Sequence, residues 1–201
     1  MSYTIIPDKA SGDTFLEANW DTSIKDNMNT GLWHPLGDVL LSAAQSSIDF
    51  SGIPQTLAHL CILAFTRSDS AVAANELRVK FNNDSGNNYD HEQYIGTGTT
   101  VTIAESLTTS GCLIGAHPAA SAVANAMGGT IAFIPYYTNT ANNKCTYSWC
   151  TFKDSTSTGG IDFRMIVGAW RSNSAISTVS VFSNGDNLIA PTRVILYGMG
   201  N

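Results

Sequence analysis

The sequence has no apolar stretch long enough to form a transmembrane helix, and its start lacks a basic segment followed by an apolar core. A membrane-spanning helix needs about 20 predominantly apolar residues, and a secretory signal needs that basic and apolar start. We therefore expect a soluble protein with no export signal and no membrane partner.

Charged side chains are scarce, at 13% of the chain, and acidic residues outnumber basic ones by 16 to 10. Binding to nucleic acid depends on concentrated positive charge that displaces counterions from the phosphate backbone. The composition therefore disfavours nucleic acid as a partner. Ser, Thr, Asn and Gly fill most segments between the apolar runs, which is typical of packed, extracellular or particle-bound β proteins.

The cysteines lack the paired CxxC spacing and the neighbouring histidines of a structural zinc site. Cys145 and Cys150 are an odd number of residues apart, so they would lie on opposite faces of one strand, which disfavours a local disulfide. We expect Cys61, Cys112, Cys145 and Cys150 to be buried and reduced, in a protein folded in bacterial cytoplasm.

Motifs of known enzyme chemistry are missing as well. His34, His59, His91 and His117 are scattered, and the sequence holds no GxSxG, HExxH, P-loop or dinucleotide-binding motif. We expect no catalytic residue and no cofactor. A site assembled only in three dimensions, such as a catalytic triad or a carboxylate pair that cleaves glycans, stays open at this point.

Residues 14–31 carry the one helical pattern of the chain. An apolar side chain recurs every four residues, at Leu16, Trp20, Ile24 and Met28, which places all of them on one helix face. Thr14 and Glu17 fit a capping box, and Gly31 lies where a left-handed C-terminal cap belongs. The apolar face must dock, either on the chain's own β domain or on a neighbouring subunit or viral shell.

After Pro35, short apolar runs separated by turn residues replace the four-residue period. We expect a first segment of residues 1–35 and a β domain of residues 36–201. The domain is predicted to be an antiparallel β-sandwich of jelly-roll type, because no helical period separates the runs. The predicted strand regions are residues 37–54 (two strands broken near Gln45), 56–67, 76–82, 99–107, 129–137, 144–152, 160–171, 175–182 and 192–198.

Two local patterns refine this expectation. Asn184 and Gly185 can both adopt positive φ, which predicts a type I′ hairpin between the run ending at Phe182 and the last strand. Alternation in residues 161–170 defines two strand faces. One carries Ile161, Phe163, Met165, Val167 and Ala169; the other is mixed, with Asp162, Arg164, Ile166, Gly168 and Trp170, and is the face we expect to line an interface.

Three passages, in residues 48–67, 77–94 and 168–200, resemble small tail-fibre, head-fibre and capsid-decoration proteins of tailed phages. They read IDFSGIPQTLAHLCILAFTR, LRVKFNNDSGNNYDHEQY, and GAWRSNSAISTVSVF with a closing VILYGMG; residues 18–31 are similar to the short helix that precedes such domains. The resemblance implies a virion component with a jelly-roll-like body, often trimeric, without catalytic residues. Residues 111–129 depart from it, so residues 108–130 could form a strand, a short helix or an exposed loop.

The passage FNNDSGNNYD, residues 81–90, predicts a tight loop, because Asn and Asp tolerate left-handed geometry and Gly86 adopts it freely. Tyr89 would anchor this loop by ring packing and its hydroxyl. Asp84, Asn87, Asp90 and Glu92 are candidate calcium ligands, but they do not match a 12-residue calcium loop with a terminal Glu. A structural turn is the favoured reading, and no metal is expected.

Aromatic residues could also form a sugar-stacking platform on the sandwich. The candidates are Trp33, Trp149, Trp170, Tyr136, Tyr137 and Tyr147. Aromatic side chains on strands more often pack in a core, so we favour core packing over a host-glycan site.

Taken together, these patterns favour a bacteriophage virion protein of the capsid-decoration or head-fibre type, assembled in the host cytoplasm. We expect it to dock through its N-terminal segment and to form a homotrimer, with the major capsid protein or tail and neck components as partners. The chain has no heptads or repeats from which to build a long shaft. The alternatives are a small tail-fibre or tail-tip protein that binds host glycans, and a glycan-degrading enzyme.

Overall fold

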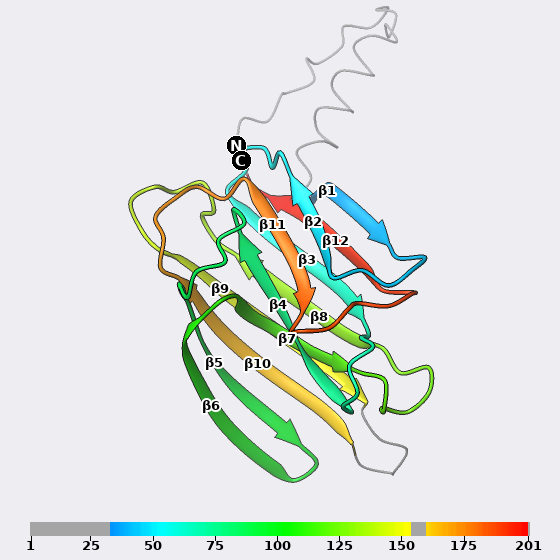
Figure 1. Ribbon diagram of the computed structural model, residues 1–201. Coiled ribbons are helices and arrows are strands. Elements are labelled where there is room, and N and C mark those ends of the chain that lie inside the picture. Colours follow the sequence, from blue (N-terminus) through cyan, green and yellow to red (C-terminus); the bar gives the residue numbers. More distant parts are fainter. Residues whose placement is uncertain (1–32, 154–159, 201) are drawn as a thin grey trace, which may run out of the picture.

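The chain forms a β-sandwich, as the computed structural model shows for residues 33–153 and 160–200. These residues contain twelve strands in two antiparallel sheets and no helix. Figure 1 shows the four-stranded sheet lying in front of the eight-stranded one, with the β5–β6 hairpin reaching past its lower end. The expected antiparallel sandwich is therefore confirmed, whereas the predicted helix lies outside the described residues.

The larger sheet has the strand order β1-β12-β3-β8-β9-β10-β5-β6 and the smaller one β2-β11-β4-β7. The strands of the larger sheet are β1 (Trp33–Leu40), β12 (Arg193–Met199), β3 (His59–Thr66), β8 (Gly128–Ile134), β9 (Lys144–Lys153), β10 (Ile161–Trp170), β5 (Tyr89–Thr97) and β6 (Thr100–Thr109). Those of the smaller sheet are β2 (Ser47–Ser51), β11 (Thr178–Ser183), β4 (Ala74–Phe81) and β7 (Cys112–Pro118).

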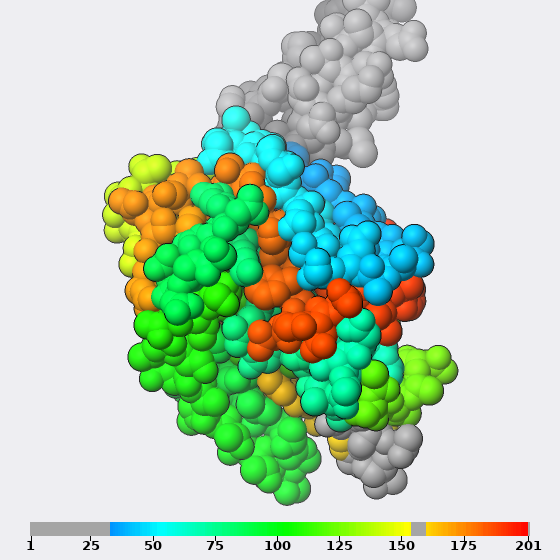
Figure 2. Space-filling model, in the orientation of Figure 1, coloured from blue at the N-terminus to red at the C-terminus, as the bar shows by residue number. Residues whose placement is uncertain are grey.

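The pairing is nested along the chain. β1 pairs with β12, β2 with β11, β3 with β8, and β4 with β7. These eight strands make the framework of the sandwich. The other four strands, β9, β10, β5 and β6, continue the larger sheet beyond β8. In the space-filling view of the same side, the β5–β6 hairpin forms the lower edge of the molecule (Figure 2).

The main hydrophobic core lies between the framework strands, where alternate residues point inward. It includes Leu60 and Ile62 of β3, Val79 of β4 and Val181 of β11, all fully buried. A second, smaller cluster lies where β7 covers β9 and β10; it consists of Leu113, Ala116, Cys150, Phe152 and Ile166. The added strands therefore have much less apolar interior than the framework.

Most strand predictions are confirmed, including the break near Gln45, which separates β1 from β2 and bridges to Leu188. Two strands were not foreseen. β5 is rich in polar residues, and β7 belongs to the segment for which strand, helix and loop were all left open; it is a fully buried strand. Trp33 starts β1, whereas the predicted β domain starts at residue 36.

Some predicted details are wrong. Residues 183–187 do turn, with φ of +84° at Gly185, but Asn184 is not left-handed, and the turn joins strands of different sheets. In the loop after β4 the left-handed residues are Asn82 and Asn83 rather than Gly86. A local pattern identifies a turn but does not reveal which sheet the following strand joins.

Candidate functional site

β9 and β10 have their polar side turned inward and their apolar side turned outward. On β9, Thr146 and Ser148 are buried, whereas Tyr147 is 47% and Trp149 39% exposed. β10 follows the same rule, with Asp162 buried and Ile161, Phe163, Met165 and Val167 exposed. The two faces predicted for β10 are thus confirmed, but the mixed face packs in the interior and the apolar face is the open one.

The strand register joins these side chains across the whole sheet. Met165 of β10 lies between Trp149 of β9 and Tyr94 of β5. The same cross-strand row contains Ile195, Leu63, Ile131, Trp149, Met165, Tyr94 and Ile103, from β12 to β6. We call the surface formed by this row and by its exposed neighbours Trp33, Phe65, Val101, Leu107, Tyr147, Ile161, Phe163 and Val167 the outer face.

Aromatic rings connect the outer face at the β1 side. The ring of Trp33 lies edge-on to Tyr197, with centroids 5.4 Å apart, and to Phe133 at 6.3 Å. Phe133 in turn contacts Trp149 at 6.0 Å. Edge-to-face packing of this kind holds rings in defined orientations. The outer face is therefore an ordered aromatic surface.

β6 shows the same outward preference at the other edge. Val101 is 73% and Ile103 57% exposed, and both lie on the outer face beside Gly96 and Tyr94 of β5. The residues that alternate with them are Thr100, Thr102 and Ala104. The apolar side of this amphipathic strand thus points away from the four-stranded sheet. Isolated apolar residues are common on protein surfaces, but a continuous apolar sheet face marks a binding surface.

Charged groups inside the sandwich are paired with each other. Arg164 donates to both carboxylate oxygens of Asp162, at 2.8 and 2.9 Å, and to Gln93 at 3.1 Å. Arg78 donates to Glu76 at 2.6 Å. These ion pairs give the charged side chains on the inner side of β10 and β4 partners of opposite charge, since a buried charge is tolerated only with a partner. They are structural contacts beneath the outer face.

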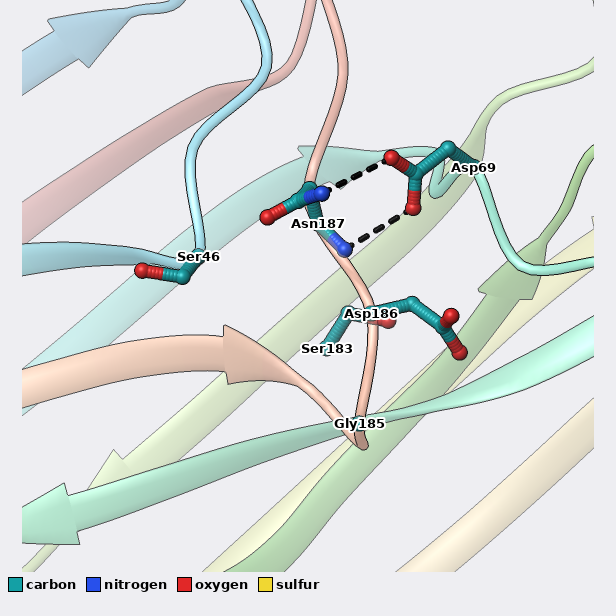
Figure 3. Close-up of a pocket in the computed structure, with 6 residues that line it drawn as sticks. All are labelled: Ser46, Asp69, Ser183, Gly185, Asp186 and Asn187. Carbon is teal, nitrogen blue, oxygen red and sulfur yellow. Dashed lines mark hydrogen bonds between the residues drawn. The ribbon is translucent and has the colours of Figure 1, made fainter.

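A polar hollow of about 490 Å³ lies at the end of β11, beside the turn that follows it. It is lined by Ser46, Asp69, Ser183, Gly185, Asp186 and Asn187 (Figure 3). The Asp69 carboxylate accepts the side-chain amide and the backbone N–H of Asn187, both at 2.9 Å. These hydrogen bonds, the side-chain amide first, hold the pKa of Asp69 below its ordinary value. Asp186 accepts Asn75 at 3.2 Å, so both carboxylates brace the loop.

Beside this hollow, the Ser183 hydroxyl lies 3.2 Å from Nε2 of His117, a pairing found in serine hydrolases. Both residues are almost completely buried, and Nδ1 of His117 bonds to no described residue. Burial lowers the pKa of His117 from 6.5 to about 4. An imidazole with so low a pKa and no orienting acceptor is a poor general base, so the pair does not favour hydrolysis.

The calcium candidates lie in separate contacts. Asp84 accepts the indole N–H of Trp170 at 2.7 Å and the backbone N–H of Gly86 at 2.9 Å, while Asp90 accepts Arg171. Glu92 lies on the outer face opposite Glu105. Among residues 33–153 and 160–200, no group of three or more His, Cys, Asp or Glu side chains could hold a metal ion.

The aromatic candidates divide between core and surface. Trp170 and Tyr137 are buried, whereas Trp33, Trp149, Tyr136 and Tyr147 are exposed. A hollow of about 340 Å³ on the outer face adjoins Tyr147 and includes Glu92 and Glu105. Sequence reasoning missed this surface, although the period-two patterns of β9 and β10 contained it. The signal was the apolar side of each strand, which carries Tyr147 and Trp149 on β9 and Phe163 and Met165 on β10.

Cys61, Cys112 and Cys150 are buried free thiols, as expected, but Cys145 is exposed on the outer face, so that prediction is wrong for Cys145. Its position opposite Cys150 on β9 confirms the odd-spacing argument. Leu16, Trp20, Ile24 and Met28, the predicted docking residues, lie outside the described residues. Within the described part of the chain, no helix is long and apolar enough to cross a membrane.

No model of a known protein family matches the sequence, and no curated protein matches it either.

Proposed function

We propose that this protein is a structural component of a bacteriophage particle, of the capsid-decoration or head-fibre type. The observation that carries the proposal is the outer face, an ordered apolar sheet surface that water covers poorly and another protein covers well. A protein that exposes an extended apolar surface when it is alone is suited to assembly. The assignment to a phage particle rests in addition on the resemblance to virion proteins of residues 48–67, 77–94 and 168–200.

We infer in addition that the sandwich is a jelly roll. In that fold a long antiparallel ribbon is rolled into two sheets, so the first strand pairs with the last and the pairing continues inward. The nested pairs β1–β12, β2–β11, β3–β8 and β4–β7 have this order. On this reading, the β5–β6 and β9–β10 strands are two insertions that widen one sheet.

The proposed assembly is a homotrimer that docks on the particle through residues 1–35, with the major capsid protein or neck and tail components as partners. The support is the apolar stripe of Leu16, Trp20, Ile24 and Met28, which would form one face of a docking helix. The predicted helix precedes β1, the edge strand of the larger sheet. A segment joined to an edge can reach a neighbour without crossing the sandwich.

Antibody labelling of purified particles in the electron microscope tests this function. We expect antibodies raised against the protein to label the heads of intact particles from a lysed host culture. Label on the tail would move the protein to the tail-tip alternative. Particles without label, from a culture whose unassembled fraction contains the protein, would contradict a virion role.

Host-glycan binding is the second candidate, favoured by the hollow on the outer face that Tyr147 lines together with Glu92 and Glu105. Aromatic rings stack on sugar faces, and carboxylates accept sugar hydroxyls. A glycan array would show retained sugars whose binding is lost in Tyr147→Ala but kept in Tyr136→Ala, an exposed tyrosine outside the hollow.

Release of sugar fragments that stops in Glu92→Gln would instead identify the third candidate, a glycan-degrading enzyme.

A further inference from the structure

We propose that the outer face is the surface through which copies of this chain associate, its occupant being the outer face of a second copy. The inference deepens the proposed assembly role and rests on it only for its biological setting. A face that packs on its own copy joins chains in pairs about a twofold axis, and this contact is separate from those of the proposed trimer. Three observations support it: the size of the face, its continuity and the contacts in the interior beneath it.

The area matches that of a protein interface. Eight strands about 4.8 Å apart span about 34 Å, and seven residues at about 3.3 Å each extend about 23 Å, so the sheet covers roughly 800 Å². A stable interface buries about 800 Å² on each partner. One face of the larger sheet therefore has the size of a protein interface.

Its shape favours a sheet over a helix as the occupant. The apolar row runs through seven consecutive strands, from Ile195 to Ile103, and a second sheet can pack against such a surface along its whole width. A helix is about 10 Å wide, so one lying along this row would cover less than half of the strands' length of about 23 Å. The predicted helix of residues 14–31 would thus leave part of the outer face in water.

Contacts in the interior of the sandwich prevent β9 and β10 from turning their apolar side inward. A one-residue shift of β9 would bury Tyr147 and Trp149 but would expose Cys150 and Phe152, which pack in the second core cluster. The same shift of β10 would turn Asp162 and Arg164 outward and would break the hydrogen bond from Arg164 to Gln93. The observed register therefore satisfies the interior and leaves the outer face for a partner.

Light scattering on the full chain after size-exclusion chromatography measures the association. We expect a mass of two chains for the unmodified protein, because the same face on two copies closes as a pair, and the mass of one chain for the double variant Trp149→Lys, Met165→Lys at the centre of the row. Val72→Lys is the matched control, since Val72 is 49% exposed in a loop outside the outer face, and it should keep the multiple mass. Circular dichroism verifies that each variant is folded.

A variant in the N-terminal stripe, Trp20→Lys with Ile24→Lys, tests the rival occupant. It should keep the multiple mass. A single-chain mass for the unmodified protein at high concentration would overturn the inference. So would a single-chain mass in the Trp20, Ile24 variant combined with a multiple mass in the Trp149, Met165 variant.

Cys145 provides a second readout on the unmodified protein, because it is the exposed thiol of the described cysteines and borders the outer face. Its rate of maleimide labelling should fall as protein concentration rises; a rate independent of concentration would contradict self-association. The proposed function and this inference fail in different ways. A protein that associates but is absent from particles would contradict the proposed function and leave this inference standing. A monomeric protein found in particles would contradict this inference and leave the proposed function standing.

Discussion

Asp84 is the residue that ties the loop after β4 to the end of β10. Its carboxylate accepts the indole N–H of Trp170 at 2.7 Å, the side-chain amide of Asn88 and the backbone N–H of Gly86. The Trp170 hydrogen bond, followed by that of Asn88, holds the pKa of Asp84 below its ordinary value against burial. Tyr89 stacks on Trp170, with ring centroids 6.2 Å apart, so the expected anchoring of the loop by Tyr89 is confirmed.

Replacing Asp84 by alanine should destabilise the sandwich by about 2 kcal/mol, because the partly buried indole N–H and the loop amides lose a charged acceptor. Urea unfolding followed by tryptophan fluorescence measures the change. Asp49→Ala is the matched control, since Asp49 is an exposed strand residue bonded only to the nearby Ser47 hydroxyl. Equal unfolding midpoints for the two variants would contradict the role of Asp84.

His117 makes stability depend on pH. Burial lowers its folded pKa from 6.5 to about 4, so between these values the unfolded chain binds a proton that the folded chain does not. The stability from neutral His117 is complete above pH 6.5 and is lost as the pH falls toward 4, by up to about 3 kcal/mol. Burial lowers the pKa of His91 as well, which acts in the same direction.

Thermal melts at pH 7.5 and pH 5 check this dependence. The Tm of the unmodified protein should be lower at pH 5, and the difference should shrink in His117→Gln, whatever the absolute Tm of the variant. His34→Gln, on the edge strand, should keep the full difference. An unchanged difference in His117→Gln would show that folding does not shift the pKa of His117.

Among the elements, β10 depends on a close approach to the sheet that covers it. A Cβ atom on Gly168 would lie 2.2 Å from Sγ of Cys112 and 2.7 Å from the Thr146 hydroxyl. Glycine thus lets β7 pack directly on β9 and β10. The small size of the second core cluster makes this contact important for the added strands.

Gly168→Ala should therefore destabilise the protein by about 1–3 kcal/mol through overpacking. Gly129→Ala on β8 is the matched control, because nothing lies within 4 Å of its added methyl group, and it should change stability little. Chemical unfolding of both variants decides the question. A Gly168→Ala protein as stable as Gly129→Ala would mean that Cys112 and Thr146 move aside without cost.

The elements differ in how far sequence could predict them. β3, β10 and β12 are apolar, alternating runs bounded by turns, and were predicted close to their observed positions. β5 alternates between buried polar groups and acidic or aromatic ones, so it lacks an apolar signal; its pairing with β10, about 70 residues away in the chain, makes it a strand. Such long-range pairing leaves no local trace.

For the whole molecule, self-association through the outer face should make thermal stability depend on protein concentration. Binding between folded copies stabilises the folded state by mass action. The Tm of the unmodified protein should rise with concentration, whereas that of the Trp149→Lys, Met165→Lys variant should not. Differential scanning calorimetry over a concentration series measures this. A constant Tm in the unmodified protein would oppose a stable assembly in solution.

The amino-acid pattern by itself determined that the part of the chain beyond Pro35 is made of antiparallel strands, because alternation of apolar residues and frequent turn signals leave few other structures. It also divided β10 into two faces correctly and placed Cys145 and Cys150 on opposite sides of β9. Only the tertiary structure decided which of these faces meets the second sheet and which remains open. Alternation defines two sides of a strand equally well, and the choice between them depends on strand pairings and charge partners that are distant along the chain.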